Sequence, residues 1–587
     1  MKKPLHLFLI LTFIICNCSY SQNTAHDTIS INNISARINN NGNLFWDHIG
    51  YSILFNVPKG SLTGTIFNTT LWVAGLDSVD TLHVAAETYD QRGHDFWSGP
   101  ISNVYDSAYD AKWDNVWKIK KTDIDYHLAH CWQPGYVPSQ ALLNYPGNGD
   151  TSLVQTKIIA PFYDWNHDGV YNPYAGDYPL IKGDEAIVFI INDARKPHTE
   201  SGGNKIDLDI VGMAYAFACN DDSALWNTIF LNYKISNRSQ NIYHDSYIGL
   251  FSDLDLGFAN DDYMGCDVQR GSFYAYNGRN IDGYGQSNAY GAHPPAQSVT
   301  FLAGPKIAGD GIDNPLGQCN EDYNGYGFGN GIIDDERLGL SKFIYFNSSG
   351  AGNPWYTGDP AIPKDYYCFL QGKWKDNIQM SYGGNAYIGM GASYGPDCNY
   401  MFPGNSDTCN WGTSGLAPNG PKYWTETTAG NQPDDRRGLG SSGPFTFYPG
   451  DTQELDVALV FGRNYTDTNA SAAIPIIQQR IDSVKKYFAN DKTPCGGSFS
   501  SIINHQQINP QIKIYPNPSD NFITIEISAF AGAAKYEMFD MVGRTVNSGS
   551  LKSSGKDRIN ISNLSKGLYF LNITDGKNKF SRKFIKQ

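Results

Sequence analysis

Residues 164–171 carry oxygen-bearing side chains at the spacing of a calcium-binding loop. In such a loop the side chains at positions one, three and five point inward, a glycine at six permits the turn, and a backbone carbonyl serves at seven. Here those ligand positions are Asp164, Asn166, Asp168 and Val170. The pattern therefore predicts that this loop binds Ca²⁺.

The end of this loop departs from a helix-flanked EF-hand. That motif requires a glutamate at position twelve, where this chain has Ala175. Asp177 follows two residues later, and we expect it to complete the ligand set. The alternative is an ordinary loop in which Asp and Asn side chains bind only their own backbone.

A second acidic cluster contains Asp253, Asp255, Asp261, Asp262 and Asp267. Carboxylates this close repel one another unless they are solvated or bound to a cation. Strand alternation would place Asp253 and Asp255 on one face. We predict a further metal site here. Paired acids are also what a glycosidase uses as acid and nucleophile or base, so a secreted hydrolase is the alternative function.

Motifs for other chemistries are absent from the sequence. It has no His-Glu-x-x-His, Gly-x-Ser-x-Gly, phosphate-binding loop or dinucleotide-binding fingerprint. The formal net charge is -14, and an acidic chain without a basic stripe argues against nucleic-acid binding. These observations favour a protein that is not an enzyme.

The elements that must position these residues are mostly strands. The chain has 38 Tyr, 30 Phe and 60 Gly, which suit half-buried pleated surfaces joined by turns. Residues 186–192 form a continuous apolar run typical of a buried strand, whereas 472–488 have helical apolar spacing. A second helix is predicted over 113–130. We expect a mainly β, multi-domain body of β-sandwiches with few helices and long loops.

The N-terminal residues 1–21 read as a secretory signal peptide. Lys2 and Lys3 precede an apolar core, and small residues at 19 and 21 predict cleavage before Gln22. The apolar run is shorter than the roughly 20 residues that a membrane anchor needs, and no later run is long enough. We expect an exported protein without a transmembrane segment.

Ten cysteines are present, and two of them fall within the signal. An even number in an exported chain predicts disulfides. Cys398 and Cys409 are the expected pair because the loop between them is short. The alternative is that several cysteines are buried free thiols.

The last segment, 511–587, has several short strands with turn signals between them, the pattern of a small immunoglobulin-like β-sandwich. It contains Tyr-Pro-Asn-Pro at 515–518, Gly-Arg at 543–544, Leu-x-x-Gly-Leu-Tyr-Phe at 564–570 and Lys-Phe-Ile-Lys at 583–586. In order and spacing these resemble the type A sorting domain of Bacteroidetes type IX secretion cargo. The resemblance implies recognition by the type IX secretion machinery, passage across the outer membrane, and release or attachment at the cell surface.

The expected organisation is a signal peptide at 1–21, an N-terminal β-rich region at 22–200, a central β-rich, loop-rich region at 201–495, a linker at 496–510 and the sorting domain. The body resembles a broad group of exported Bacteroidetes proteins that brings no activity with it. We therefore expect a secreted or outer-surface protein, stabilised by calcium, that serves adhesion, binding or structure. A surface glycan or a protein is its expected ligand.

Overall fold

The computed structural model describes residues 25–587 apart from 90–91, 317–318, 320–323, 348–353, 391–392, 501–511, 528–533, 553–554 and 575–578. The predicted signal peptide and most of the predicted linker lie outside the described residues. Within the described part, no helix is both long and apolar enough to cross a membrane.

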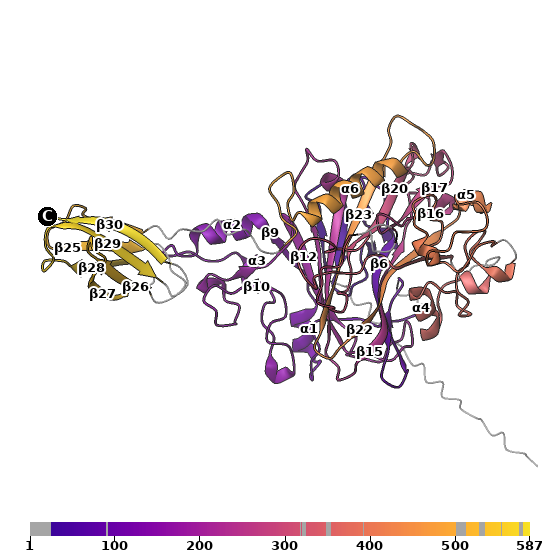
Figure 1. The fold of residues 1–587 in the computed structure, drawn as a ribbon. Helices are drawn as coiled ribbons and strands as arrows, with labels where there is room; N and C mark the ends of the chain where they lie inside the picture. The colour runs from indigo at the N-terminus through magenta and orange to yellow at the C-terminus, as the bar shows by residue number, and fades with distance from the viewer. Residues whose placement is uncertain are drawn as a thin grey trace, which may run out of the picture.

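The larger sheet of the body has nine antiparallel strands (Figure 1). Their order is β16-β17-β20-β23-β14-β13-β12-β8, with β9 also paired to β12. β23, a strand from late in the chain, thus lies between the earlier strands β20 and β14. The bounds are β8 (Trp97–Ser98), β9 (Trp117–Lys120), β12 (Glu185–Asn192), β13 (Leu208–Ala216), β14 (Thr228–Asn237), β16 (Asp262–Asp267), β17 (Ser272–Asn277), β20 (Pro295–Ala303) and β23 (Thr452–Arg463).

The second sheet has five strands in the order β21-β22-β15-β6-β7. Both sheets take strands from either side of residue 200, so the regions 22–200 and 201–495 pack together. The strand bounds are β6 (Asn68–Leu76), β7 (Leu82–Ala86), β15 (Tyr243–Asp253), β21 (Lys342–Asn347) and β22 (Arg436–Phe447).

The nine-stranded sheet is buried on both faces. In β12, Ile187 and Phe189 belong to the core shared with the five-stranded sheet, whereas Val188 and Ile190 belong to a second core on the opposite face. Strand alternation explains the division, because successive side chains point to opposite faces. The continuous apolar run at 186–192 is thus a buried strand, as predicted, and the mainly β fold is confirmed.

One predicted helix is confirmed, and the other is confirmed only in its second part. Helix α6 (Ile474–Ala489) buries Ile477 and Ile481 against β23 and β20. The predicted helix at 113–130 is instead the end of α1 (Ser107–Trp113), then β9, then α2 (Lys121–His130). Strand pairing with β12 overrides helix formation in β9, because it buries Trp117 and Ile119 there.

Short elements complete the body. Small sheets form from β1 (His26–Ile29), β2 (Ser35–Asn39) and β5 (Phe55–Asn56), from β3 (Trp46–Asp47) and β4 (Ser52–Ile53), from β10 (Phe162–Tyr163) and β11 (Tyr178–Pro179), and from β18 (Ile281–Asp282) and β19 (Gly291–Ala292). The remaining helices are α3 (Gln140–Leu143), α4 (Pro363–Leu370) and α5 (Glu426–Ala429), and the 3₁₀ turns are Thr151–Leu153, Pro173–Ala175, Leu225–Asn227, Ala259–Asp261, Trp355–Thr357, Ile388–Met390 and Trp411–Thr413.

The described residues form two disulfides, Cys219–Cys495 and Cys319–Cys409. The expected pair of Cys398 with Cys409 is therefore wrong. Cys398 is a buried free thiol within the core between the sheets, where a cysteine behaves as a small apolar residue. Sequence proximity was a poor guide, because the chain brings Cys319 to Cys409 from much further away.

The C-terminal segment is a separate sandwich with its own core, drawn in yellow in Figure 1. One sheet has the order β24-β25-β28 and the other β27-β26-β29-β30. The bounds are β24 (Ile512–Tyr515), β25 (Phe522–Ile527), β26 (Ala534–Phe539), β27 (Thr545–Leu551), β28 (Gly555–Asn560), β29 (Gly567–Thr574) and β30 (Lys579–Lys586).

The Pro-Asn-Pro motif of this sandwich holds the last strand in place. The Asn517 side chain accepts a hydrogen bond from the backbone N–H of Ile585 (2.9 Å) and donates one to the carbonyl of Lys583 (3.2 Å). The N–H of Ser519 also donates to the Ile585 carbonyl. The two sequence motifs at opposite ends of the segment are therefore in direct contact.

Candidate metal centre

Three carboxylates converge at one end of the five-stranded sheet. Asp253, Asp255 and Asp435 each offer one oxygen, and these oxygens lie within 4.8 Å of one another. Asp253 is the last residue of β15, and Asp435 directly precedes β22. The pairing of these strands, which sets Asp253 opposite Arg437, brings the acids together. Sequence reasoning missed Asp435 because only this long-range pairing connects it to the first two.

An arginine and a fourth acid border the cluster. Arg437 donates to Asp435 (3.3 Å), and its Nε lies 3.6 Å from Asp253 and 3.7 Å from Asp359. Its guanidinium also stacks over the ring of Tyr89. Four acids facing one guanidinium leave a net negative charge when all are ionised, which is costly in a buried place.

The cluster contains oxygens that the protein itself does not satisfy. The Oδ1 atoms of Asp253, Asp255 and Asp435 are buried and accept no hydrogen bond from the described residues, although that of Asp435 lies 3.2 Å from the Nη1 of Arg437. Burial raises the pKa of Asp253 to about 7, against the opposing effect of Arg437, and burial also raises the pKa of Asp255 well above its usual value. Buried polar atoms are nearly always paired, so this arrangement indicates a missing positive partner.

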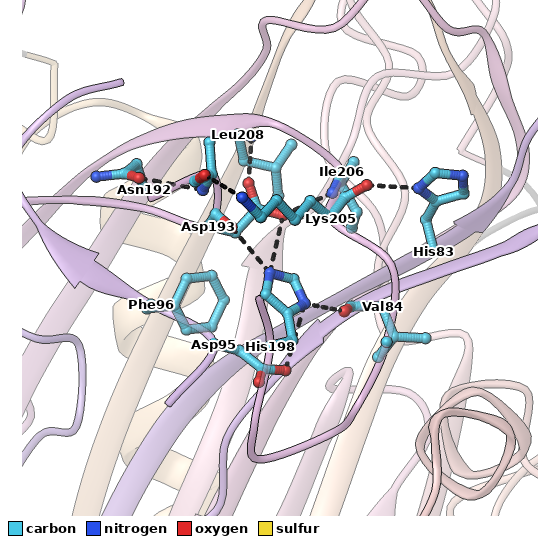
Figure 2. Close-up of polar contacts among 12 residues, drawn as sticks. His83, Val84, Asp95, Phe96, Asn192, Asp193, His198, Lys205, Ile206 and Leu208 are labelled. Atoms are coloured by element: carbon cyan, nitrogen blue, oxygen red, sulfur yellow. Dashed lines mark hydrogen bonds and ion pairs between the residues drawn. The ribbon is translucent and has the colours of Figure 1, made fainter. Parts of the chain in front are cut away.

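A second buried acidic network in the same molecule has no such deficit (Figure 2). Asp193 accepts backbone N–H bonds from Ile206 and Leu208 at 2.7 and 2.6 Å. The His198 ring lies between Val84 and Asp193. Its Nδ1 is 2.7 Å from the Val84 carbonyl oxygen, and its Nε2 is 2.9 Å from the Asp193 carbonyl oxygen. Protein groups satisfy this network, whereas the cluster at the end of β15 leaves several carboxylate oxygens, and the Nε and Nη1 atoms of Arg437, without a hydrogen bond among the described residues.

The predicted calcium loop adopts a tight turn. Asp164 accepts from the N–H of Gly169 (2.8 Å), and Asp168 accepts from the N–H of Val170 (2.7 Å). The Asn166 amide donates to Asp168. Gly169 has a φ of +71°, the left-handed conformation that favours glycine. The four predicted ligands of 164–170 therefore share one loop, and one buried oxygen of Asp164 has no hydrogen-bond partner among the described residues.

Asp177 lies beneath this loop and is fully buried. Its two oxygens accept backbone N–H bonds from Trp165 and Asn172, both at 2.8 Å. Burial raises its pKa, and the nearby Asp164 and Asp168 act in the same direction. Asp177 thus joins the two ends of the loop through backbone hydrogen bonds.

The five acids of 253–267 do not form one group. Asp261 and Asp262 lie at the start of β16 and are fully buried, with Asp262 accepting the N–H of Leu256 (2.9 Å). Asp267 is at the other end of β16, where Arg270 (2.9 Å) and Gln478 (2.8 Å) bind it. The strand therefore separates Asp267 from the other four.

Comparison with known proteins identifies the C-terminal segment. The profile of the secretion system C-terminal sorting domain matches residues 513–587. A comparison with curated protein sequences gave no match. The resemblance read from the Tyr-Pro-Asn-Pro and Lys-Phe-Ile-Lys motifs is thus confirmed.

Three solved structures show limited similarity. A DUF3244 family protein with an immunoglobulin-like β-sandwich fold from Bacteroides vulgatus is 20% identical, with 14% of this chain and 86% of that chain covered, at a TM-score of 0.12. A biofilm-associated protein BSP domain is 12% identical over 25% and 37% of the two chains, with a TM-score of 0.13. The polysaccharide lyase BACCELL_00875 is 6% identical over 68% and 35%, with a TM-score of 0.17. At TM-scores this low, none of these likenesses indicates an activity.

Proposed function

Because the chain ends in a type IX sorting domain, which marks it as cargo for secretion and the cell surface, we propose that its body is a calcium-stabilised adhesion, binding or structural protein. The observation that carries this proposal is the convergence of Asp253, Asp255 and Asp435 with buried oxygens that accept no hydrogen bond from the described part of the chain. A bound cation would supply the charge that Arg437 alone does not.

Calcium is the cation that suits these groups best. The offered atoms are all carboxylate oxygens, which hard cations such as Ca²⁺ prefer over nitrogen or sulfur ligands. Calcium also accepts irregular coordination with backbone carbonyls and water, so three carboxylates are a sufficient protein core. We propose the loop of Asp164, Asn166, Asp168, Val170 and Asp177 as another calcium site.

The alternative function, a glycosidase, fits the same residues less well. Glycoside hydrolysis requires two carboxyl groups that flank a substrate bond in an open cleft. Asp253 is 3% exposed and Arg437 is 6% exposed, while the Asp435 side chain reaches 27%. The burial of Asp253 leaves little room for a sugar ring beside it, whereas a single ion is small enough to bind there. Burial therefore supports a structural cation over catalysis.

The test is the effect of calcium on thermal unfolding of the mature protein. Calcium at 100 times its dissociation constant adds about 2.7 kcal/mol of stability, so the melting temperature should rise by several degrees over the EDTA-treated protein. Asp435→Asn should remove most of the shift that arises from this site, and Asp168→Asn the part that arises from the loop.

Asp267→Asn is the matched control, because Asp267 is also a buried acid of the same segment but is bound by Arg270. Its calcium-dependent shift should equal that of the wild type, whatever its basal stability. Identical melting of the wild type with calcium and with EDTA would refute the proposal. Hydrolysis of a polysaccharide that is lost in Asp255→Asn would favour the glycosidase instead.

A further inference from the structure

A second group of buried oxygens lies directly beside the first cluster. Asp262 is fully buried, and its Oδ2 accepts the N–H of Leu256, the residue after Asp255. Its backbone carbonyl accepts the N–H of Asp434 (3.1 Å), the residue before Asp435. Asp262 therefore contacts the chain on both sides of the first cluster.

Asn277 adds a neutral oxygen to this group. It is the cross-strand partner of Asp262 in the β16–β17 pair, and it is fully buried. Its amide nitrogen donates a hydrogen bond to the carbonyl of Arg279 (2.9 Å), while its Oδ1 has no hydrogen-bond partner in the described part of the chain. Directly opposed residues project to the same face of a sheet, so this oxygen lies on the side of Asp262.

The neighbouring acids Asp261 and Asp262 also have buried oxygens without a hydrogen bond among the described residues. The Oδ1 atoms of Asp261 and Asp262 are buried and accept no hydrogen bond among the described residues. Asp261 uses its other oxygen to bind the N–H of Gly283 (3.0 Å). Asp262 forms no ion pair with any described residue, since Arg437 pairs with Asp253, Asp359 and Asp435. Asp261 has the positive charge of Arg279 and the Asn277 side chain nearby. Among the described residues, the buried Oδ1 atoms of Asp262 and Asn277 have no hydrogen-bond donor, and Asp262 has no ion-pair partner.

From these contacts we propose a second divalent-cation site, formed by Asp261, Asp262 and Asn277 and adjacent to the site of Asp253, Asp255 and Asp435. The inference rests on the proposed calcium-stabilised function. The ligand class is a hard, oxygen-seeking cation, because two carboxylates and an amide carbonyl are oxygen donors of the kind found in calcium sites. Two neighbouring ions would hold the ends of β15, β16 and β22 together.

The competing arrangement is a protonated Asp262 that donates a hydrogen bond to the Asn277 oxygen. It satisfies both atoms without a cation, because a neutral carboxylic acid is a donor. The two arrangements differ in the number of ions bound, so stoichiometry distinguishes them.

The experiment measures bound calcium per chain by equilibrium dialysis and elemental analysis. The proteins are the wild-type mature chain, Asp435→Asn, Asp262→Asn and the double variant, with Asp267→Asn as the control. We expect each single variant to lose one ion, the double variant to lose two, and the control to lose none.

Each other outcome is informative. Loss of no ion in Asp262→Asn would overturn the second site and leave the first intact. Loss of only one ion in the double variant would show that all these residues share one ion. Loss of none in Asp435→Asn would contradict the proposed function itself.

Asn277→Asp keeps the test falsifiable if Asp262→Asn does not fold. A carboxylate here should tighten calcium binding and increase the calcium-dependent rise in melting temperature. If Asn277 only accepts a hydrogen bond from Asp262, the added like charge should lower the melting temperature and leave the calcium effect unchanged, which would overturn the proposal.

Discussion

Asp456 and Asp253 are both buried aspartates, yet their carboxyl groups have opposite pKa shifts. Burial raises the pKa of Asp253 to about 7. Burial would also raise that of Asp456, but Lys182 (2.7 Å) and Arg337 (2.8 Å) outweigh it and hold the pKa at about 2. The number of close cations, not the depth of burial, decides which aspartate is stably ionised.

From the ion pairs of Asp456 with Lys182 and Arg337, we expect the folded protein to lose stability in acid. Its folded pKa lies below the unfolded value, so the unfolded chain binds more protons between these values and stability falls as the pH falls from about 4 to about 2. The shift corresponds to ~2 kcal/mol. Urea unfolding at pH 6 should show Asp456→Asn destabilised by about 3–5 kcal/mol, because Lys182 and Arg337 lose their buried partner.

The difference in the free energy of unfolding between Asp456→Asn and the wild type should become smaller below pH 4, since the wild-type carboxyl then becomes protonated. A gap that stays constant from pH 6 to pH 2.5 would contradict the assigned ion pairs. At this scale the sequence predicted that Asp253 and Asp255 lie close together, which they do, although Asp255 lies beyond the end of β15. It could not predict Asp435 or Lys182, which reach their partners only through distant strand pairing.

At the scale of elements, the periodicity of apolar residues was enough to predict a helix or strand where a single periodic face is buried. Helix α6 repeats its apolar residues at helical spacing and was predicted correctly. Residues 113–130 contain a strand that pairs with β12 and has no local signature of its own. The disulfide partners were beyond prediction for the same reason, since Cys219 and Cys495 are separated by 276 residues.

The Cys219–Cys495 disulfide should contribute strongly to stability. It ties the chain just after β13 to the segment that follows α6, and it closes a long loop. Removing a native disulfide typically costs about 2–5 kcal/mol, so Cys219→Ser should melt several degrees below the wild type.

Cys131→Ser is the matched control, because Cys131 is a free thiol and its replacement should leave melting nearly unchanged. A reducing agent should bring the wild type toward the Cys219→Ser variant. Equal melting of wild type and Cys219→Ser under oxidising conditions would show that the bond does not form in the folded protein.

At the scale of the whole molecule, the body and the C-terminal sandwich have separate cores. The sorting motifs could be recognised in the sequence because each is a short continuous segment and all of them lie within one small sandwich. The two-sheet body was predicted only as mainly β, because its strand order joins segments hundreds of residues apart.

Deleting residues 513–587 should therefore separate folding from delivery. The truncated chain should keep the melting temperature and calcium response of the body, because no core residue of the body is removed. Cell fractionation should find it retained inside the outer membrane, whereas the full chain reaches the surface. Surface delivery of the truncated chain would contradict the role of the sorting domain.

The central position of β23 also determines when this protein can fold. β23 pairs with β14 on one side and β20 on the other, so these two strands present open edges until residues 452–463 arrive. Open apolar edges are prone to pair with other chains. The chain must therefore keep these edges from pairing with other chains until most of its length is available for folding.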